Sequence, residues 1–133
     1  MPRTLAVLLA ILSLGLSSCG EKDTHQKIMT DNLVLLGRVA SILEDVENEE
    51  SAKAAAKELE TLIEEFEVIA ERSDAIGKPT AEIEDSLNNS YDKQRTQIHQ
   101  RLTTATEKAK ATQGNKTLLE TLDRLGKTWN KIH

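Results

Sequence analysis

Ile76-Gly77-Lys78-Pro79-Thr80 divides the chain into two helical halves. Glycine readily takes the left-handed backbone conformation at the end of a helix, and proline cannot continue a helix because it lacks an amide hydrogen. Thr80 suits the N-cap of a following helix, and acidic residues occupy the first turn after it, where the helix dipole favours negative charge. The stretch therefore predicts that one helix ends at 76 and that another begins directly after 80.

The chain before this boundary predicts two helices. Seven apolar residues recur at helical spacing: Ala52, Ala55, Leu59, Leu62, Phe66, Ile69 and Ile76. Asn48 suits the N-cap of the helix that carries them, expected over 49–76. The apolar row changes phase after Val46, so we expect a tight turn at 47–48 and an earlier helix over 24–46. The alternative is one long bent helix, because neither glycine nor proline marks the break.

The earlier helix should bury a wide apolar face, because two neighbouring rows of apolar residues run along it. Asn32 is the one polar residue in the first row, whose other members are Ile28, Leu35, Val39, Ile42 and Val46. Asp23 is expected as the N-cap, with Gln26 reaching back to the cap residue.

The helix after the boundary has a weaker apolar stripe. Its members are Leu87, Tyr91, Ile98, Leu102, Ala105 and Ala109, and Gln94 interrupts them. The remaining positions are mainly threonine, glutamine, asparagine and charged residues. This helix should therefore lie at the periphery of the fold.

Gln113-Gly114-Asn115 should end this helix. Thr117 and Glu120 predict a capping box that opens a last helix over 117–132. Short connections favour an all-α fold, an antiparallel three- to four-helix bundle over 23–133. The bundle has three helices if the last two continue as one rod.

The N-terminal stretch 1–18 has the features of a secretory signal peptide. Arg3 supplies a positive charge, an unbroken apolar run covers 5–12, and small residues close the stretch. Spanning a membrane takes about 20 apolar residues, and this run is shorter. We therefore expect the stretch to be removed.

Leu16-Ser17-Ser18-Cys19 resembles the lipobox of bacterial lipoproteins. The resemblance implies cleavage before Cys19, a diacylglyceryl group on its sulfur, and acylation of its new amine by a chain such as palmitate. Cys19 is the only cysteine of the chain, so it cannot form an internal disulfide. The alternative is a signal peptide without a lipid and a chance cysteine. If Cys19 carries the lipid, residues 19–22 are the lipidated cysteine and a short tether.

The residue after the cysteine is Gly20 and not aspartate. This resembles the signal for outer-membrane sorting in bacteria with two membranes. We therefore expect attachment to the bacterial cell envelope by the lipid, facing the periplasm or the outside, with the outer membrane favoured over the inner.

Charge is divided unevenly along the chain. Residues 19–80 hold 7 basic and 15 acidic residues, whereas residues 81–133 hold 9 basic and 7 acidic residues. The acidic half should repel nucleic acid, so we expect no nucleic-acid partner. The two halves attract each other weakly, which favours a fold in which the second half packs back against the first.

The residues that bind metals or catalyse reactions do not form a known pattern. The acidic stretch 45–50 lacks the glycine and the glutamate that a calcium-binding EF-hand loop needs. No histidine follows a glutamate at the spacing of a di-iron bundle, and a single cysteine excludes the common zinc sites. We therefore expect no metal, no cofactor other than the lipid on Cys19, and no enzyme activity.

Haem is the cofactor that is hardest to dismiss. Met29 and His133 lie near the start of the first helix and the end of the last, where periplasmic four-helix cytochromes carry their ligands. No motif for covalent haem attachment accompanies them. Met29 is also well placed to be an ordinary core residue.

Ser51-Ala52-Lys53-Ala54-Ala55, followed by the boundary stretch 76–80, resembles small helical lipoproteins of bacterial envelopes. The resemblance covers most of 35–105. It implies no activity and transfers no functional residues.

These patterns favour a structural or protein-interaction module of the cell envelope. The surface expected to bind a protein partner lies on the helix with the weakest apolar stripe and consists of Gln97, Gln100, Thr103 and Thr104. Amide and hydroxyl groups suit a hydrated, reversible interface. The alternative is a periplasmic bundle that binds a small ligand or haem.

Overall fold

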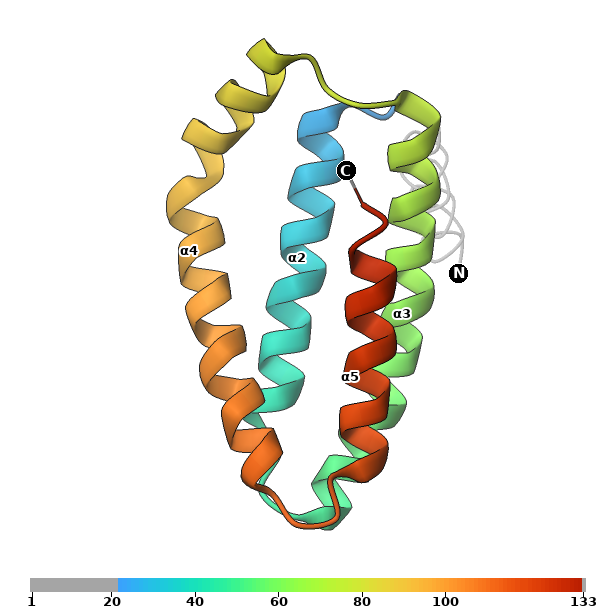
Figure 1. Ribbon diagram of the computed structural model, residues 1–133, viewed down its shortest axis with the longest axis vertical. Coiled ribbons are helices and arrows are strands. Elements are labelled where there is room, and N and C mark those ends of the chain that lie inside the picture. Colours follow the sequence, from blue (N-terminus) through green and yellow to red (C-terminus); the bar gives the residue numbers. More distant parts are fainter. Residues whose placement is uncertain (1–21, 133) are drawn as a thin grey trace, which may run out of the picture.

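The computed structural model describes residues 22–132, which form four helices and no strands (Figure 1). The helices are α2 (His25–Glu44), α3 (Glu49–Ile76), α4 (Ala81–Ala111) and α5 (Lys116–Trp129). The expected all-α class is confirmed for this part of the chain. The expected signal peptide and Cys19 lie outside the described residues.

The boundary at 76–80 has the expected geometry. Gly77 has a φ of 74° and its amide donates to the carbonyl oxygens of the last turn of α3. The hydroxyl of Thr80 accepts a hydrogen bond of 3.3 Å from the amide of Ile83. Both ends of this connection are therefore determined by residues within it.

The turn before α3 is also confirmed, and a single bent helix is excluded. Asn48 and Ser51 form a reciprocal capping box, in which each side chain accepts a hydrogen bond of 2.9 Å from the other residue's amide. These bonds satisfy two amide groups that a helix start leaves without partners.

The predicted N-cap of the first helix is wrong by one residue. Thr24 is the N-cap, and its hydroxyl accepts from the amide of Lys27 at 3.1 Å. Asp23 instead accepts two hydrogen bonds from Arg72 of α3. A cationic partner on another helix therefore takes the carboxylate that sequence alone assigns to capping.

The predicted capping box of the last helix is also wrong. The helix begins at Lys116, so Thr117 lies within it. Asn115 precedes it, and its side chain donates to the carbonyl oxygens of Ala109 and Lys110 at 3.2 and 2.9 Å. Asn115 thus closes the end of α4 rather than capping α5, which ends at Trp129, three residues earlier than expected.

The turn between α4 and α5 requires glycine at position 114. Its φ is 71°, and a β-carbon there would collide with the side chain of Glu49 at the start of α3. The turn therefore lies tightly against the first turn of α3, and α4 and α5 are two separate helices.

Helices that follow one another in the chain run in opposite directions (Figure 1). The most extensive packing nevertheless joins parallel pairs, α2 with α4 and α3 with α5, while α2 also packs along α3. Contact between α4 and α5 is sparse. As a result, α4 is attached to the bundle mainly along α2.

The core is centred on α3. Phe66, Leu59 and Leu62 are fully buried, as expected from the apolar row. Leu122, which the apolar spacing of the last helix also predicts in the core, is only partly buried. Ten of the 28 residues of α3 are buried, but only three of the 31 residues of α4. All three lie in the second half of α4, so its first half adds no buried residue to the core.

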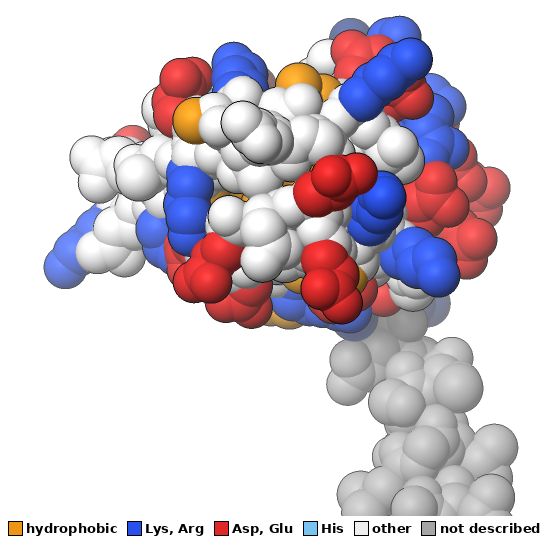
Figure 2. All heavy atoms as spheres, turned by 90° about the horizontal axis from the view of Figure 1, so that it is seen from below, with side chains coloured by type: hydrophobic (Ala, Val, Ile, Leu, Met, Phe, Trp, Pro, Cys, Tyr) orange, Lys and Arg blue, Asp and Glu red, His pale blue; other side chains and the backbone are white. Residues whose placement is uncertain are grey.

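The end of the bundle that carries the α2–α3 turn shows acidic and basic side chains side by side, with little hydrophobic surface between them (Figure 2). Within residues 22–132, no helix is both long enough and apolar enough to cross a membrane.

A cluster of charged groups joins the start of α2 to α3. Arg72 donates to Asp23 at 2.7 Å and to Asp31 at 2.8 Å, and Lys27 donates to Asp31 at 3.1 Å. The hydrogen bond from Arg72 holds the pKa of Asp23 below its ordinary value. Burial opposes this for Asp31, but the bonds from Arg72 and Lys27 outweigh it, so its pKa is lowered as well.

These lowered pKa values predict that the cluster contributes stability above about pH 4, the range in which aspartates of an unfolded chain are ionised. The contribution should disappear as the pH falls through the lowered pKa values of the folded protein. Arg72→Met should reduce the stability at pH 7 and flatten its decline below pH 4. Urea unfolding at pH 7 and pH 3 measures both effects, and Arg38→Met, which removes a more exposed pair with Glu65, is the control. An unchanged dependence of stability on pH in Arg72→Met would contradict the role of Arg72 in lowering the two aspartate pKa values.

Candidate binding surface and cavity on α4

The four residues of the predicted interaction surface are all exposed on α4. Gln100, Thr103 and Thr104 line a shallow hollow along this helix, together with His99. The hydroxyl of Thr103 donates to the carbonyl oxygen of His99 at 2.9 Å. Gln97 does not line the hollow. The structure therefore brings three of the four predicted residues together and separates the fourth.

The position of Gln97 follows from the way α4 is attached to α2. Residues four apart share a helix face, so Gln97 lies one turn before Arg101. Arg101 donates to Glu44 at 2.8 Å, and Lys108 donates to the carbonyl oxygen of Glu44 at 2.9 Å. The hydrogen bond from Arg101 lowers the pKa of the Glu44 carboxyl. Gln97 thus lies on the edge of α4 that meets α2.

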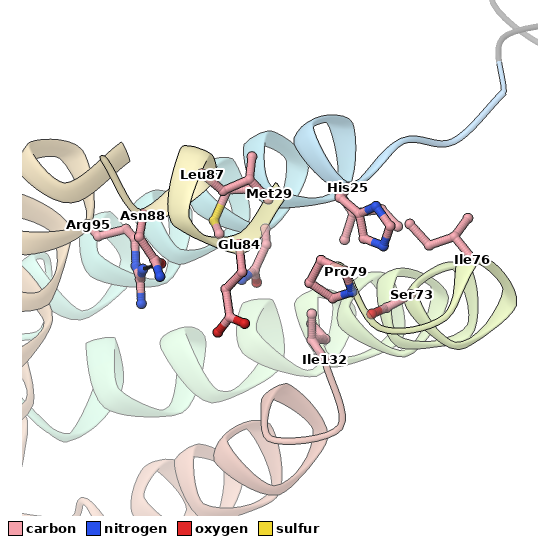
Figure 3. Close-up of a pocket in the computed structure, with 12 residues that line it drawn as sticks. His25, Met29, Ser73, Ile76, Pro79, Glu84, Leu87, Asn88, Arg95 and Ile132 are labelled. Atoms are coloured by element: carbon pink, nitrogen blue, oxygen red, sulfur yellow. Dashed lines mark hydrogen bonds between the residues drawn. The ribbon is translucent and has the colours of Figure 1, made fainter. Parts of the chain in front are cut away.

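A second feature is a cavity between α2, the end of α3, α4 and the segment that follows α5. It has two adjoining parts, of about 190 and 270 Å³. The two parts share the lining residues Met29, Asn32, Arg95 and Ile132. Figure 3 shows the first part, which lies toward the end of the bundle where α2 begins. The cavity forms because the first half of α4 does not close against α5.

Two polar groups of this cavity stand out. Arg95 donates to the side-chain oxygen of Asn88 at 2.7 Å and has no carboxylate partner among residues 22–132. The side-chain oxygen of Asn32 is buried and has no hydrogen-bond partner in the described part of the chain. Arg95 also borders the shallow hollow, so it lies where the two features meet.

Only one of these two residues carries a signal in the sequence. Asn32 interrupts an otherwise apolar row, which marks it as a polar group on a buried face. Arg95 is one of several charged residues on an exposed helix, so its sequence position does not set it apart. In the fold it lines the same cavity as Ile132, which lies in the segment after α5. Met29, considered above as a haem ligand, lines the cavity, and its proposed partner His133 lies outside the described residues.

Within residues 22–132, no group of three or more histidine, cysteine or acidic side chains is placed to hold a metal ion. His25 is engaged elsewhere, because its Nε2 atom lies 3.0 Å from the carbonyl oxygen of Gly77. No family model, curated protein or solved structure matches this chain.

Proposed function

We propose that this chain is a lipid-anchored protein of the bacterial cell envelope that binds another protein through the exposed face of α4. Gln100, Thr103 and Thr104 form that face. The observation that carries the proposal is the low burial of α4, the longest of the four helices, which places three residues in the core. A helix of this length that is held mainly along one edge leaves a long surface for a partner.

The resemblance of Leu16-Ser17-Ser18-Cys19 to a lipobox supports the anchor. Residues 20–22 would span only about 10 Å even when fully extended, at about 3.3–3.6 Å per residue. The bundle would therefore stay close to the membrane, and its partner would be a protein of the same membrane or of the space beside it.

The chemistry of the face favours a reversible protein contact. Its groups are neutral hydroxyls and an amide, which form hydrogen bonds directly or through water. The hydroxyl of Thr103 donates to the backbone carbonyl oxygen of His99 and not to its imidazole, whereas covalent catalysis needs a nucleophile that donates to a general base. Binding rather than catalysis is therefore the function that this surface supports best.

The test is crosslinking in cells with a matched pair of variants. Gln100→Glu places a charge in the shallow hollow and should reduce the yield of crosslinked partner by roughly five- to tenfold, the loss expected when about 1 kcal/mol or more of interface energy is removed. Gln97→Glu makes the same change on the edge that meets α2 and should leave the crosslink intact. Both variants should keep their unfolding free energy within about 0.5 kcal/mol, as exposed substitutions usually do.

Equal crosslinking by Gln100→Glu, Gln97→Glu and the unchanged chain would leave α4 as an ordinary solvated surface. The exposed acidic residues of α3, Glu64, Glu67 and Glu71, would then form the next surface to examine.

A further inference from the structure

The wall of the cavity beside α2 is mainly apolar and comes from five separate segments. Six apolar side chains line it: Ile28 and Met29 of α2, Ile76 of α3, Pro79 of the connection at 77–80, Leu87 of α4, and Ile132 after α5. Met29, Leu87 and Ile132 surround the same space in Figure 3. Such a wall favours an apolar chain over a small polar solute, because burial of apolar area is the main source of binding free energy there.

Arg95 gives the cavity a cationic end. A guanidinium group has five hydrogen-bond donors, and the guanidinium of Arg95 makes a single hydrogen bond within residues 22–132, the one to Asn88. Its planar fork matches the oxygens of a carboxylate or a phosphate. Because no carboxylate of the described chain neutralises it, Arg95 is available to an anionic group of a ligand.

Asn32 supplies a second polar contact in the same place. Its buried oxygen has no partner, and a buried polar atom without a hydrogen bond is uncommon enough to need an explanation. Asn32 lines both parts of the cavity, as Arg95 does, and its amide NH₂ can donate to an anionic group there.

Glu84 fixes the direction in which a ligand would lie. It lines the first part of the cavity but not the second. It precedes Arg95 by eleven residues, which is about 16 Å along the helix. An anionic group would therefore avoid Glu84 and lie beside Arg95.

We propose that this cavity binds an anionic amphiphile, meaning an apolar chain with a carboxylate or phosphate group, which Arg95 holds by its charged end. The apolar chain runs from Arg95 past Met29 and Ile132, which line both parts of the cavity, into the second part toward Trp129. This ligand site is distinct from the protein-binding face, although Arg95 borders both.

The position of the cavity agrees with this class of ligand. The start of α2 and the connection at 77–80 lie at one end of the bundle, and the segment that follows α5 runs toward that end (Figure 1). The first part of the cavity lies at that end, where the chain arrives from Cys19. If the lipid anchor proposed above holds, that end faces the lipid. The contacts of Arg95, Asn32 and the apolar wall do not depend on the anchor.

Trp129 makes the proposal measurable, because it is the only tryptophan of the chain and lines the second part of the cavity. The full chain is mixed with vesicles of zwitterionic phosphatidylcholine and titrated with dibromostearate, whose bromine atoms quench tryptophan on contact. Saturable quenching is expected. The measurement does not require attachment to the vesicles, so failure of the anchor would not affect it.

Four variants test the role of the charge. Arg95→Gln should weaken binding at least tenfold, whereas Arg95→Lys should retain most of the affinity. Lys93→Gln is the matched control, since it removes a positive charge from an exposed position of α4 that does not line the cavity. Glu84→Gln should bind as tightly as the unchanged chain or more tightly. Circular dichroism confirms that each variant is folded.

A second arm separates the two sources of such a ligand. Vesicles that contain phosphatidylglycerol with brominated chains replace the free fatty acid. Quenching by dibromostearate alone identifies a free fatty acid, and quenching by the brominated vesicles alone identifies a membrane phospholipid. Either result supports the proposal if Arg95→Gln reduces the quenching and Lys93→Gln does not.

Three outcomes overturn the proposal. These are no quenching in either arm, equal quenching in Arg95→Gln and Lys93→Gln, and a loss of affinity in Glu84→Gln as large as in Arg95→Gln. The last result would mean that the cavity requires a positively charged group in its ligand.

Discussion

Replacement of Cys19 by alanine should abolish the incorporation of palmitate and release the protein from the membrane. The thioether forms on the sulfur of Cys19, the only sulfhydryl in the chain. Each methylene buried in lipid contributes about 0.8 kcal/mol, and two or more acyl chains make attachment stable. Loss of that sulfur should therefore change membrane attachment from nearly complete to nearly absent.

Two measurements check this result. Metabolic labelling with an alkyne analogue of palmitate reports the lipid, and phase partitioning in a detergent that separates on warming reports attachment. Ser13→Ala is the matched control, because it changes the leader without touching the four residues that resemble a lipobox. Full labelling of the Cys19→Ala variant, or its complete retention in the detergent phase, would show that the lipid is not on this residue.

Phe66→Ala should destabilise the bundle by roughly 3–5 kcal/mol. Phe66 is 0% exposed and is the largest of the fully buried side chains. Its removal takes apolar area from the core and leaves a space that the surrounding helices fill only in part. Domains of this size have a total stability of about 5–15 kcal/mol, so the variant should unfold at much lower denaturant concentration.

Urea unfolding followed by circular dichroism measures the change. Val68→Ala is the control on the same helix, because Val68 is 54% exposed. It should alter the unfolding free energy by about 0.5 kcal/mol or less. A change below about 1 kcal/mol in Phe66→Ala would contradict the central place of this side chain in the core.

The bounds of α3 could be predicted from sequence because every signal for them is local. Asn48 caps its start, Gly77 ends it, and one apolar row connects the two. The observed helix, Glu49–Ile76, has the bounds that these signals predict. Local signals suffice when the residues that decide an element lie within it or directly beside it.

The errors come from residues whose partners are distant in sequence. Asp23 would be a good N-cap if Arg72 did not lie beside it in the fold. Asn115 turns back to α4 because two carbonyl oxygens there need donors. Neither partner can be identified before the helices are placed relative to one another.

The same reason limits what sequence shows of the binding surfaces. Gln97 and Gln100 have the same side chain three residues apart on one helix. Only the packing of α4 along α2 places the first on the edge and the second in the hollow. The cavity beside Arg95 involves three helices and the chain end, so a pattern along one helix cannot predict it.

The pairing of parallel helices has a consequence for the order in which this protein folds. The bonds that join the two halves connect residues far apart in the chain, such as Arg101 with Glu44 and Arg124 with Glu60, at separations of 57 and 64 residues. Contacts of this kind require closure of a long loop, which slows folding. The hairpin of α2 and α3 needs only a short turn, whereas α4 and α5 touch each other too little to form a stable hairpin alone. The α2–α3 hairpin should therefore form first and act as the template on which α4 and α5 dock, each against its own helix.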